Sequence, residues 1–143
     1  MRWAFGVCFA VAVVYPAASV GLQQRSVADG VYTRAQADRG KKSYALYCES
    51  CHAADLSGTN SGDSGAPPLR RDGFMQGSDA NALFTKIRDT MPFDAPGSLG
   101  NAEYLDILAF IFQENGFPAG DTPMTADAEL LKTIRIVRAA PGR

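Results

Sequence analysis

The stretch Cys48-Glu49-Ser50-Cys51-His52 places two thiols and an imidazole within five residues, and His52 is the only histidine in the chain. Two cysteines separated by two residues on a helical turn can reach the two vinyl groups of one porphyrin, and the residue that follows then lies under the iron. The Cys-x-x-Cys-His spacing is typical of c-type haem attachment. We therefore predict that Cys48 and Cys51 bind a haem covalently and that His52 is an axial ligand of its iron.

Three other interpretations of this motif compete with haem attachment. A thioredoxin-like redox pair would follow a strand within a βαβ unit, whereas the residues before Cys48 have a helical pattern. A zinc site needs four ligands, and the only further cysteine or histidine is Cys8, near the N-terminus. A disulfide between Cys48 and Cys51 stays open, although it would give His52 no role.

The first 20 residues have the features of an export signal. Arg2 supplies a positive end, residues 3–14 are apolar and Pro16 ends the run, as in secretory signal peptides. An apolar run of about twelve residues is too short for a bilayer core, which needs roughly twenty. We therefore expect residues 1–20 to be a cleaved signal peptide, the mature protein to be periplasmic, and the signal to be its only association with a membrane.

Length and composition indicate one ordinary globular domain. The chain has 143 residues, of which 46% are hydrophobic, and a formal net charge of −1. Loss of Arg2 with the signal peptide would make the mature protein slightly more acidic. A nucleic-acid-binding domain would carry a basic patch, so we predict no nucleic-acid partner.

The helix before the motif has a clear start signal. Thr33 and Gln36 have the spacing of a capping box, which predicts a helix over residues 34–47. Gly40 lies in the middle of this helix, where glycine costs about 1 kcal/mol relative to alanine, so we expect another helix to approach it closely. The face that repeats at three- and four-residue steps carries Ala37, Gly40, Tyr44 and Tyr47.

Loops and further helices follow the motif. Residues 53–72 form a long loop rich in Gly, Ser, Asn and Asp, closed by the stiff segment Pro67-Pro68-Leu69. A short helix is predicted over residues 81–89, capped by Ser78 or Asp79. A second strong helix is predicted over residues 101–114; it is apolar on most sides and therefore buried.

The two ends of the chain differ in character from the middle. Residues 21–32 are polar and small, and we predict a flexible lead-in before a domain that spans residues 33–120. Residues 121–143 are predicted to be a C-terminal extension packed on the domain, with a short helix over residues 126–132. Its basic side chains Arg135, Arg138 and Arg143 are expected to be solvated.

Taken together, several of these features resemble the small single-haem c-type cytochromes with His/Met axial ligation. The features are Gly40 and Tyr44 before the haem motif, Pro67-Pro68-Leu69, Met91-Pro92, and the apolar helix that contains residues 103–110. The resemblance implies an all-α, cytochrome c-like fold. Its helices would pack around one covalently bound haem c, with long loops and an extended C-terminal strap.

The resemblance also implies further site residues. The carbonyl group of Pro67 would accept a hydrogen bond from the ring of His52, and the sulfur of Met91 would be the second iron ligand. Met75 follows His52 by only 23 residues, whereas Met91 follows it by 39, which leaves more chain to reach the other face of the haem. Residues expected to pack on the haem are Tyr44, Leu69, Phe84, Phe93, Ile107 and Leu108.

A third methionine of the mature chain, Met124, is the other rival of Met91 as the iron ligand. Residues 91–99 and 115–120 are similar to those of bacterial cytochromes that accept electrons from quinoprotein dehydrogenases. Two departures are the absence of tryptophan from residues 74–83 and the presence of Arg71 where such sequences commonly have glycine.

The resemblance implies a periplasmic electron carrier and not an enzyme. Its redox partners would be a quinoprotein dehydrogenase and a terminal oxidase or another acceptor. Two alternatives stay open. One is a haem-based sensor or peroxidase-like enzyme with a displaceable methionine, and the other is a haem subunit permanently bound to a quinoprotein dehydrogenase.

Overall fold

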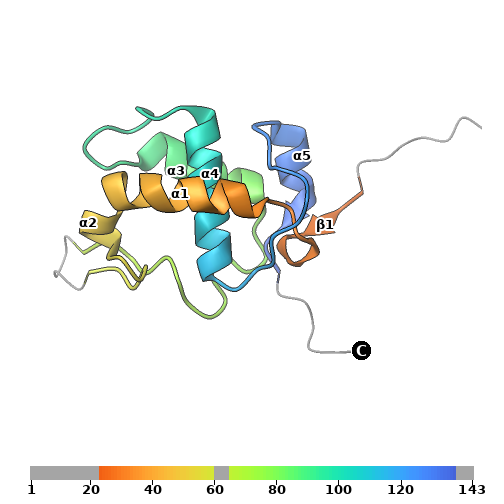
Figure 1. Ribbon diagram of the computed structural model, residues 1–143, viewed down its shortest axis with the longest axis horizontal. Helices are drawn as coiled ribbons and strands as arrows, with labels where there is room; N and C mark the ends of the chain where they lie inside the picture. The colour runs from red at the N-terminus through yellow and green to blue at the C-terminus, as the bar shows by residue number, and fades with distance from the viewer. Residues whose placement is uncertain (1–22, 60–64, 138–143) are drawn as a thin grey trace, which may run out of the picture.

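Five helices and one small sheet form the part of the chain that the computed structural model describes, residues 23–59 and 65–137 (Figure 1). The predicted signal peptide lies outside these ranges. The mostly helical architecture expected from the sequence is confirmed. None of the helices in the described ranges has the length and apolar character needed to span a membrane. The helices are α1 (Arg34–Tyr47), α2 (Glu49–His52), α3 (Ala80–Thr90), α4 (Asn101–Glu114) and α5 (Ala128–Thr133).

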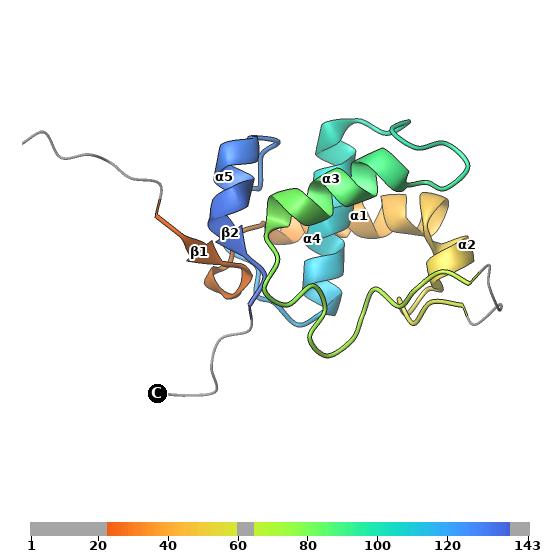
Figure 2. The same cartoon turned by 180° about the vertical axis from the view of Figure 1, so that it is seen from behind.

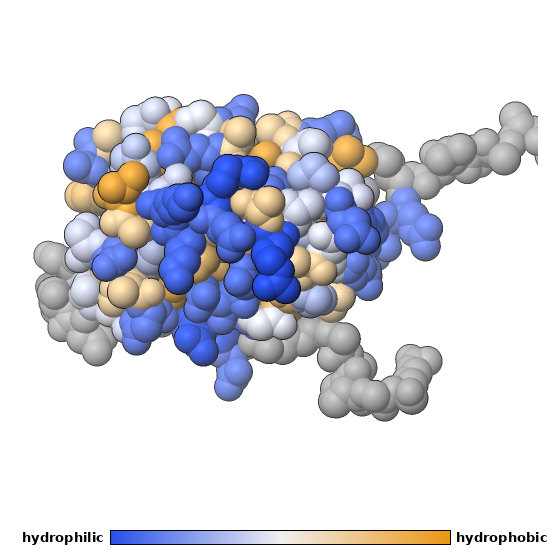
Figure 3. Space-filling model, viewed as in Figure 1, coloured by the Kyte–Doolittle hydropathy of each residue, from blue (hydrophilic) through white to orange (hydrophobic). Residues whose placement is uncertain are grey.

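Helix α1 has the predicted bounds because its capping box forms. The Thr33 hydroxyl accepts a hydrogen bond from the Gln36 amide at 3.2 Å, and the Gln36 side chain accepts one from the Thr33 amide at 3.3 Å. The face of α1 turned to the viewer in Figure 1 is largely hydrophilic (Figure 3). Tyr47, which we placed on the same face as Gly40 and Tyr44, is 41% exposed.

Helices α1 and α4 cross at Gly40, as the sequence predicted (Figures 1 and 2). A Cβ atom on Gly40 would lie 1.8 Å from the carbonyl oxygen of Asp106, so any side chain would push the two backbones apart. The Asp106 carboxylate accepts two hydrogen bonds from the Arg39 guanidinium, at 2.7 and 2.8 Å, across the same crossing. This crossing fixes α1, and with it the start of the haem motif, relative to α4.

Helix α4 is the central element of the core. Its residues from Tyr104 to Phe112 are all buried, as predicted for a helix that is apolar on most sides. Helix α3 packs against α4, and α5 packs against α3 (Figure 2). Asp79, and not Ser78, caps α3, because its side chain accepts a hydrogen bond from the Ala82 amide at 2.9 Å.

The prediction that residues 21–32 form a flexible lead-in is wrong for the described residues 23–32. Strand β1 (Arg25–Ser26) pairs in parallel with β2 (Ile134–Arg135), and a 3₁₀ turn, η1 (Val27–Asp29), follows. Val27 and Tyr32 are fully buried. The Tyr32 hydroxyl donates a hydrogen bond to the Phe117 carbonyl at 2.6 Å. These few anchors order a segment whose overall composition is polar.

The C-terminal part of the chain completes this arrangement. Helix α5 begins after Asp127, whose side chain caps it, and Leu131, Ile134 and Ile136 are buried. Arg135 is not simply solvated, because its guanidinium lies 3.6 Å from the Asp79 carboxylate. Arg138 and Arg143 lie outside the described residues. We call residues 23–33 and 117–137 the terminal module.

Candidate haem site

A cavity of about 550 Å³ lies at the end of the molecule that contains α2 and the loops on either side of α3, the right-hand end in Figure 2. The structure brings all six predicted site residues to it: Cys48, Cys51, His52, Pro67, Leu69 and Met91. Its other walls are mainly apolar and come from the segment before α3, from α3 and from α4. They include Phe74, Met75, Leu83, Ile87, Ile107 and Ile111.

The imidazole of His52 is held in one orientation. His52 is 6% exposed, and its Nδ1 lies 2.9 Å from the Pro67 carbonyl oxygen, the contact that the resemblance implied. A carbonyl oxygen only accepts hydrogen bonds, so in the neutral imidazole Nδ1 carries the proton and Nε2 keeps its lone pair. An Nδ1–H bond to a backbone carbonyl is the usual support for a histidine that ligates a metal through Nε2.

The two cysteines differ in exposure. Cys48 is half-buried, Cys51 is exposed, and neither is in a disulfide. Burial, together with the nearby Cys51, raises the pKa of the Cys48 thiol to about 11. Cys48 is therefore protonated at neutral pH, which disfavours disulfide exchange because the thiolate is the attacking form. Within the described ranges, no group of three or more His, Cys, Asp or Glu side chains is arranged to hold a metal ion.

The Pro67 carbonyl is placed by a close approach of two backbone segments. Gly58 has a φ of +76°, and a Cβ atom there would lie 2.5 Å from the Ala66 oxygen and 2.8 Å from the Pro67 carbonyl carbon. Two hydrogen bonds, from the Thr59 amide to Ala66 at 3.1 Å and from the Leu69 amide to Leu56 at 2.9 Å, flank this approach. Sequence reasoning placed Gly58 in a glycine-rich loop but gave it no role at the site.

The three methionines of the described residues differ in whether they line the cavity. Met91 and Met75 line it, whereas Met124 is buried elsewhere, with its backbone hydrogen-bonded to the Gln36 side chain at 3.1 and 2.9 Å. Met124 is therefore not placed to be an iron ligand. Because both Met91 and Met75 line the cavity, their location alone does not decide which of them is the second iron ligand.

Tyr104 of α4 holds the loop that carries Met91. Its hydroxyl donates to the Met91 carbonyl at 2.8 Å and accepts from the Leu99 amide at 3.4 Å. The Met91 amide donates to the Ile87 carbonyl at the end of α3, at 2.9 Å. The Met91 backbone is thus fixed on both sides. Sequence reasoning placed Tyr104 within a buried apolar helix, over residues 101–114, and missed its hydroxyl.

Half of the residues expected to pack on the haem line the cavity, namely Leu69, Phe93 and Ile107. The other three, Tyr44, Phe84 and Leu108, are buried in the core and do not line it. Tyr44 contributes indirectly, because its hydroxyl donates to the carbonyl of Ala53, the residue after His52, at 2.7 Å. It therefore supports the segment that carries the histidine.

The chemistry of the cavity fits a c-type haem. Two thiols and a histidine with an available Nε2 come from one short segment, and apolar side chains form most of the remaining walls. Its charged lining residues, Arg71, Lys86 and Asp94, are all exposed. A porphyrin has an apolar ring, which suits the apolar walls, and two carboxylate groups, which suit the exposed charged rim.

A family comparison supports the same conclusion. Residues 35–111, more than half of the chain, match the family described as cytochrome C oxidase, cbb3-type, subunit III. The match spans the haem motif, Pro67, Leu69 and Met91. No curated protein and no solved structure matches the chain. A cytochrome c domain implies covalently bound haem c and electron transfer, and such domains are typically exported. The chain therefore belongs to the family of cytochrome c oxidase, cbb3-type, subunit III, and is a c-type cytochrome.

Proposed function

We propose that the protein is a periplasmic electron carrier with a single haem c, attached through Cys48 and Cys51 and ligated by His52 and Met91. The observation that supports this most directly is the 2.9 Å hydrogen bond between His52 Nδ1 and the Pro67 carbonyl. It would leave Nε2 of His52 available to bind the iron in a cavity that His52 and both thiols line.

The residues of the cavity have distinct tasks. The haem, when bound, supplies a centre that takes up and releases one electron. The Pro67 carbonyl keeps His52 in the Nδ1–H tautomer and makes it a more basic ligand. The apolar walls would exclude water from a bound haem, and solvent exposure is one of the properties that set a haem potential. The two thioethers would keep the haem on the chain through every redox cycle.

We assign the second ligand to Met91 and not to Met75. The backbone of Met91 is fixed on both sides by the end of α3 and by Tyr104, which suits a ligand that stays bound in both oxidation states. Met75 has a φ of 49° and lies within tight turns, where the Ser78 amide donates to its carbonyl at 2.9 Å. A methionine sulfur raises the reduction potential relative to harder donors.

Redox titration and carbon monoxide binding test this assignment. The protein matured with a haem-attachment system should titrate as one reversible one-electron couple. Its ferric form should show the near-infrared sulfur-to-iron band, and its ferrous form should resist carbon monoxide at neutral pH. Met91→Ala should erase the band and admit carbon monoxide, whereas Met75→Ala, the matched control, should do neither. Rapid carbon monoxide binding by the unaltered protein would instead favour the sensor or peroxidase class.

We further propose that the electron donor is a quinoprotein dehydrogenase and that it docks on the loop of residues 91–99, with a terminal oxidase or similar protein as acceptor. Phe93, at the edge of the cavity, is 86% exposed, and an apolar contact of this kind suits a short-lived complex. The small net charge of the chain gives little long-range steering, so reduction should depend only weakly on salt.

A charge placed on this loop tests the docking surface. Phe93→Glu should slow reduction by the dehydrogenase in stopped-flow measurements without changing the haem spectrum. Leu130→Glu is the matched control, because Leu130 is also an exposed large apolar residue but lies on α5 and does not line the cavity. Equal rates for the two variants, or a steep fall in rate with ionic strength, would place the docking surface elsewhere.

A further inference from the structure

We propose that Asn115 is a positioning residue for the haem ligand His52, acting through the segment of residues 67–71. The inference rests on the proposed function, in which His52 binds the iron. Asn115 follows the last residue of α4, and the sequence alone gave it no role at the site.

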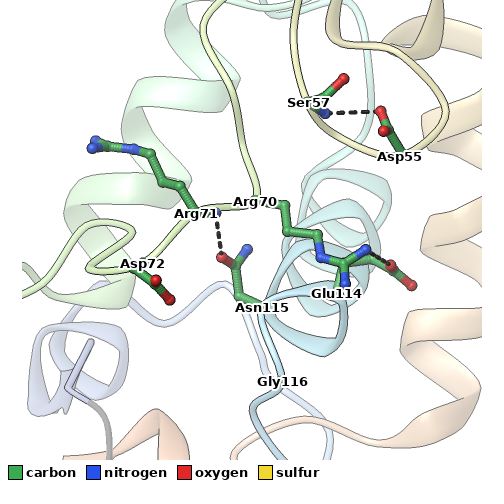
Figure 4. Close-up of a pocket in the computed structure, with 8 residues that line it drawn as sticks. All are labelled: Asp55, Ser57, Arg70, Arg71, Asp72, Glu114, Asn115 and Gly116. Carbon is green, nitrogen blue, oxygen red and sulfur yellow. Dashed lines mark hydrogen bonds and ion pairs between the residues drawn. The ribbon is translucent and has the colours of Figure 1, made fainter.

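The side-chain amide of Asn115 is buried and uses both its donor and its acceptor. Asn115 is 4% exposed. Its Nδ2 donates to the carbonyl oxygens of Leu69 and Ile111, both at 2.8 Å, and its Oδ1 accepts from the Arg71 amide at 3.3 Å (Figure 4). The bond to Ile111 is local and would suffice for a helix cap. The bonds to Leu69 and Arg71 join α4 to a segment more than 40 residues earlier in the chain.

This segment is held from a second direction as well. The amides of Leu69 and Arg70 donate to the Leu56 carbonyl at 2.9 and 3.2 Å. Asn115 and Leu56 therefore both form hydrogen bonds with the backbone of residues 69–71. Pro67 and Pro68 lie immediately before it, and their fixed φ angles make the connection stiff. A displacement of Leu69 is thus passed to the Pro67 carbonyl, which is the hydrogen-bond acceptor for His52.

The position of Asn115 in the molecule supports this role. Asn115 lines a second, open depression of about 560 Å³, and Arg71 lines both this depression and the haem cavity. Arg71, whose amide donates to Asn115, thus connects Asn115 to the wall of the haem cavity. Three charged groups of the depression have partners (Figure 4): Arg70 lies 3.8 Å from Glu114, and Asp55 accepts from the Ser57 amide at 3.0 Å. The side chain of Arg71 is directed away from Asn115.

The chain provides a matched control for this amide. Gln36 is also 4% exposed and also grips a distant backbone, with its Nε2 donating to the Met124 carbonyl at 3.1 Å and its Oε1 accepting from the Met124 amide at 2.9 Å. Gln36, however, forms these hydrogen bonds with the terminal module and not with a segment that lines the haem cavity. Removal of either amide leaves buried backbone groups without a partner, so Asn115→Leu and Gln36→Leu should lower stability by comparable amounts.

Two measurements on the holoprotein separate positioning from stability. In NMR spectra, the Nδ1 proton of His52 should exchange with solvent at least tenfold faster in Asn115→Leu than in the unaltered protein. The reduction potential should also rise, because a weaker Nδ1–H bond makes His52 a less basic ligand and favours ferrous iron. Gln36→Leu should change neither quantity. Asn115→Ser, which is smaller, provides the same comparison if the leucine variant does not fold.

The outcomes are distinct. If Asn115→Leu and Asn115→Ser lose stability but keep the exchange rate and the potential of the unaltered protein, Asn115 is only a structural residue and the inference is wrong. If Gln36→Leu shifts the potential as much as Asn115→Leu does, the effect is global and the inference is again wrong. If the unaltered protein shows no iron-bound His52 signal, the proposed function itself fails, and the inference fails with it.

Discussion

The haem cavity and the terminal module both contain contacts to helices α1 and α4, but their interiors are filled in different ways. Each contains a segment gripped by a buried amide, Asn115 at the cavity and Gln36 at the terminal module. In the terminal module the apolar side chains pack against one another, and Val27, Tyr32, Leu131 and Ile136 are almost fully buried. In the cavity the apolar side chains surround a space of about 550 Å³. The polypeptide alone thus completes one region, whereas the other needs the haem.

This difference predicts where the cofactor stabilises the protein. A domain of about a hundred residues is marginal on its own, and a tightly bound group that binds only the folded state adds its binding free energy to stability. We therefore expect the chain without haem to be poorly folded, and its loss of protection to be greatest around the cavity.

The largest effect should follow from removing the haem attachment. The double variant Cys48→Ser/Cys51→Ser should carry no covalent haem after maturation. Hydrogen exchange should show the greatest loss of protection at residues 67–75 and 91–99, and a smaller loss at the terminal module. Equal loss in both regions would show that the terminal module is not complete without the cofactor.

Disruption of the crossing that both regions share should come next. Gly40→Ala places a methyl group against the Asp106 carbonyl, where a Cβ atom would lie 1.8 Å from the oxygen. Because backbone, and not a flexible side chain, must move, we expect a loss of about 3 kcal/mol or more in the free energy of unfolding. Gly100→Ala is the control, since a Cβ atom there meets nothing within 4 Å, and it should cost about 1 kcal/mol or less. Chemical denaturation of both holoproteins measures the difference.

A smaller effect confined to the cavity is expected from Tyr104→Phe. The variant loses the hydrogen bonds that tie Met91 and Leu99 to α4, which should cost about 1 kcal/mol. The released loop should let carbon monoxide bind to the ferrous protein faster than in the unaltered protein. An unchanged rate would mean that Tyr104 does not hold Met91 in place.

The corresponding change in the terminal module is Tyr32→Phe, which removes the bond to the Phe117 carbonyl. It should also cost about 1 kcal/mol, but the haem spectrum and carbon monoxide rate should stay the same. Any change in the spectrum would show that the two regions are coupled.

The same residue gives a pH dependence with a definite sign. Burial raises the pKa of Tyr32 from 10.0 to about 12. The neutral phenol therefore stabilises the folded state below pH 10, and this contribution is lost as pH rises from 10 towards 12. Unfolding measured across this range should show a shallower decline in Tyr32→Phe than in the unaltered protein. A decline of the same slope in both proteins would contradict this assignment.

The sequence predicted the parts of the fold that local signals determine. The capping box of Thr33 and Gln36 gave the start of α1, and the apolar run over residues 101–114 gave α4 with the observed bounds. The ordered structure of residues 23–32 was missed, because its partners lie far along the chain. The Tyr32 hydroxyl bonds to the carbonyl of Phe117, 85 residues later, and Arg25–Ser26 pair with Ile134–Arg135. No local pattern carries that information.

The site residues likewise divide into those that a local sequence signal identifies and those that act through tertiary contacts. The haem motif is a local signal, so Cys48, Cys51 and His52 could be identified directly. The residues that support them, Gly58, Tyr104 and Asn115, act through contacts with other segments of the chain, from Ala66 for Gly58 to Leu69 for Asn115. An asparagine before a glycine at a helix end has a sufficient local explanation as a cap, which concealed its bonds to Leu69 and Arg71. A fold was needed to see that α4 holds both loops of the cavity.

The central claim is that this chain binds one haem covalently at Cys48 and Cys51. The most direct test is to mature the protein with a haem-attachment system, extract it with acid-acetone, and measure the mass of the recovered polypeptide. We predict an increase equal to one haem, retained on the polypeptide under denaturing conditions and located by digestion to the peptide that contains both cysteines. A chromophore that is extracted into the solvent, or a polypeptide without added mass, would contradict the account.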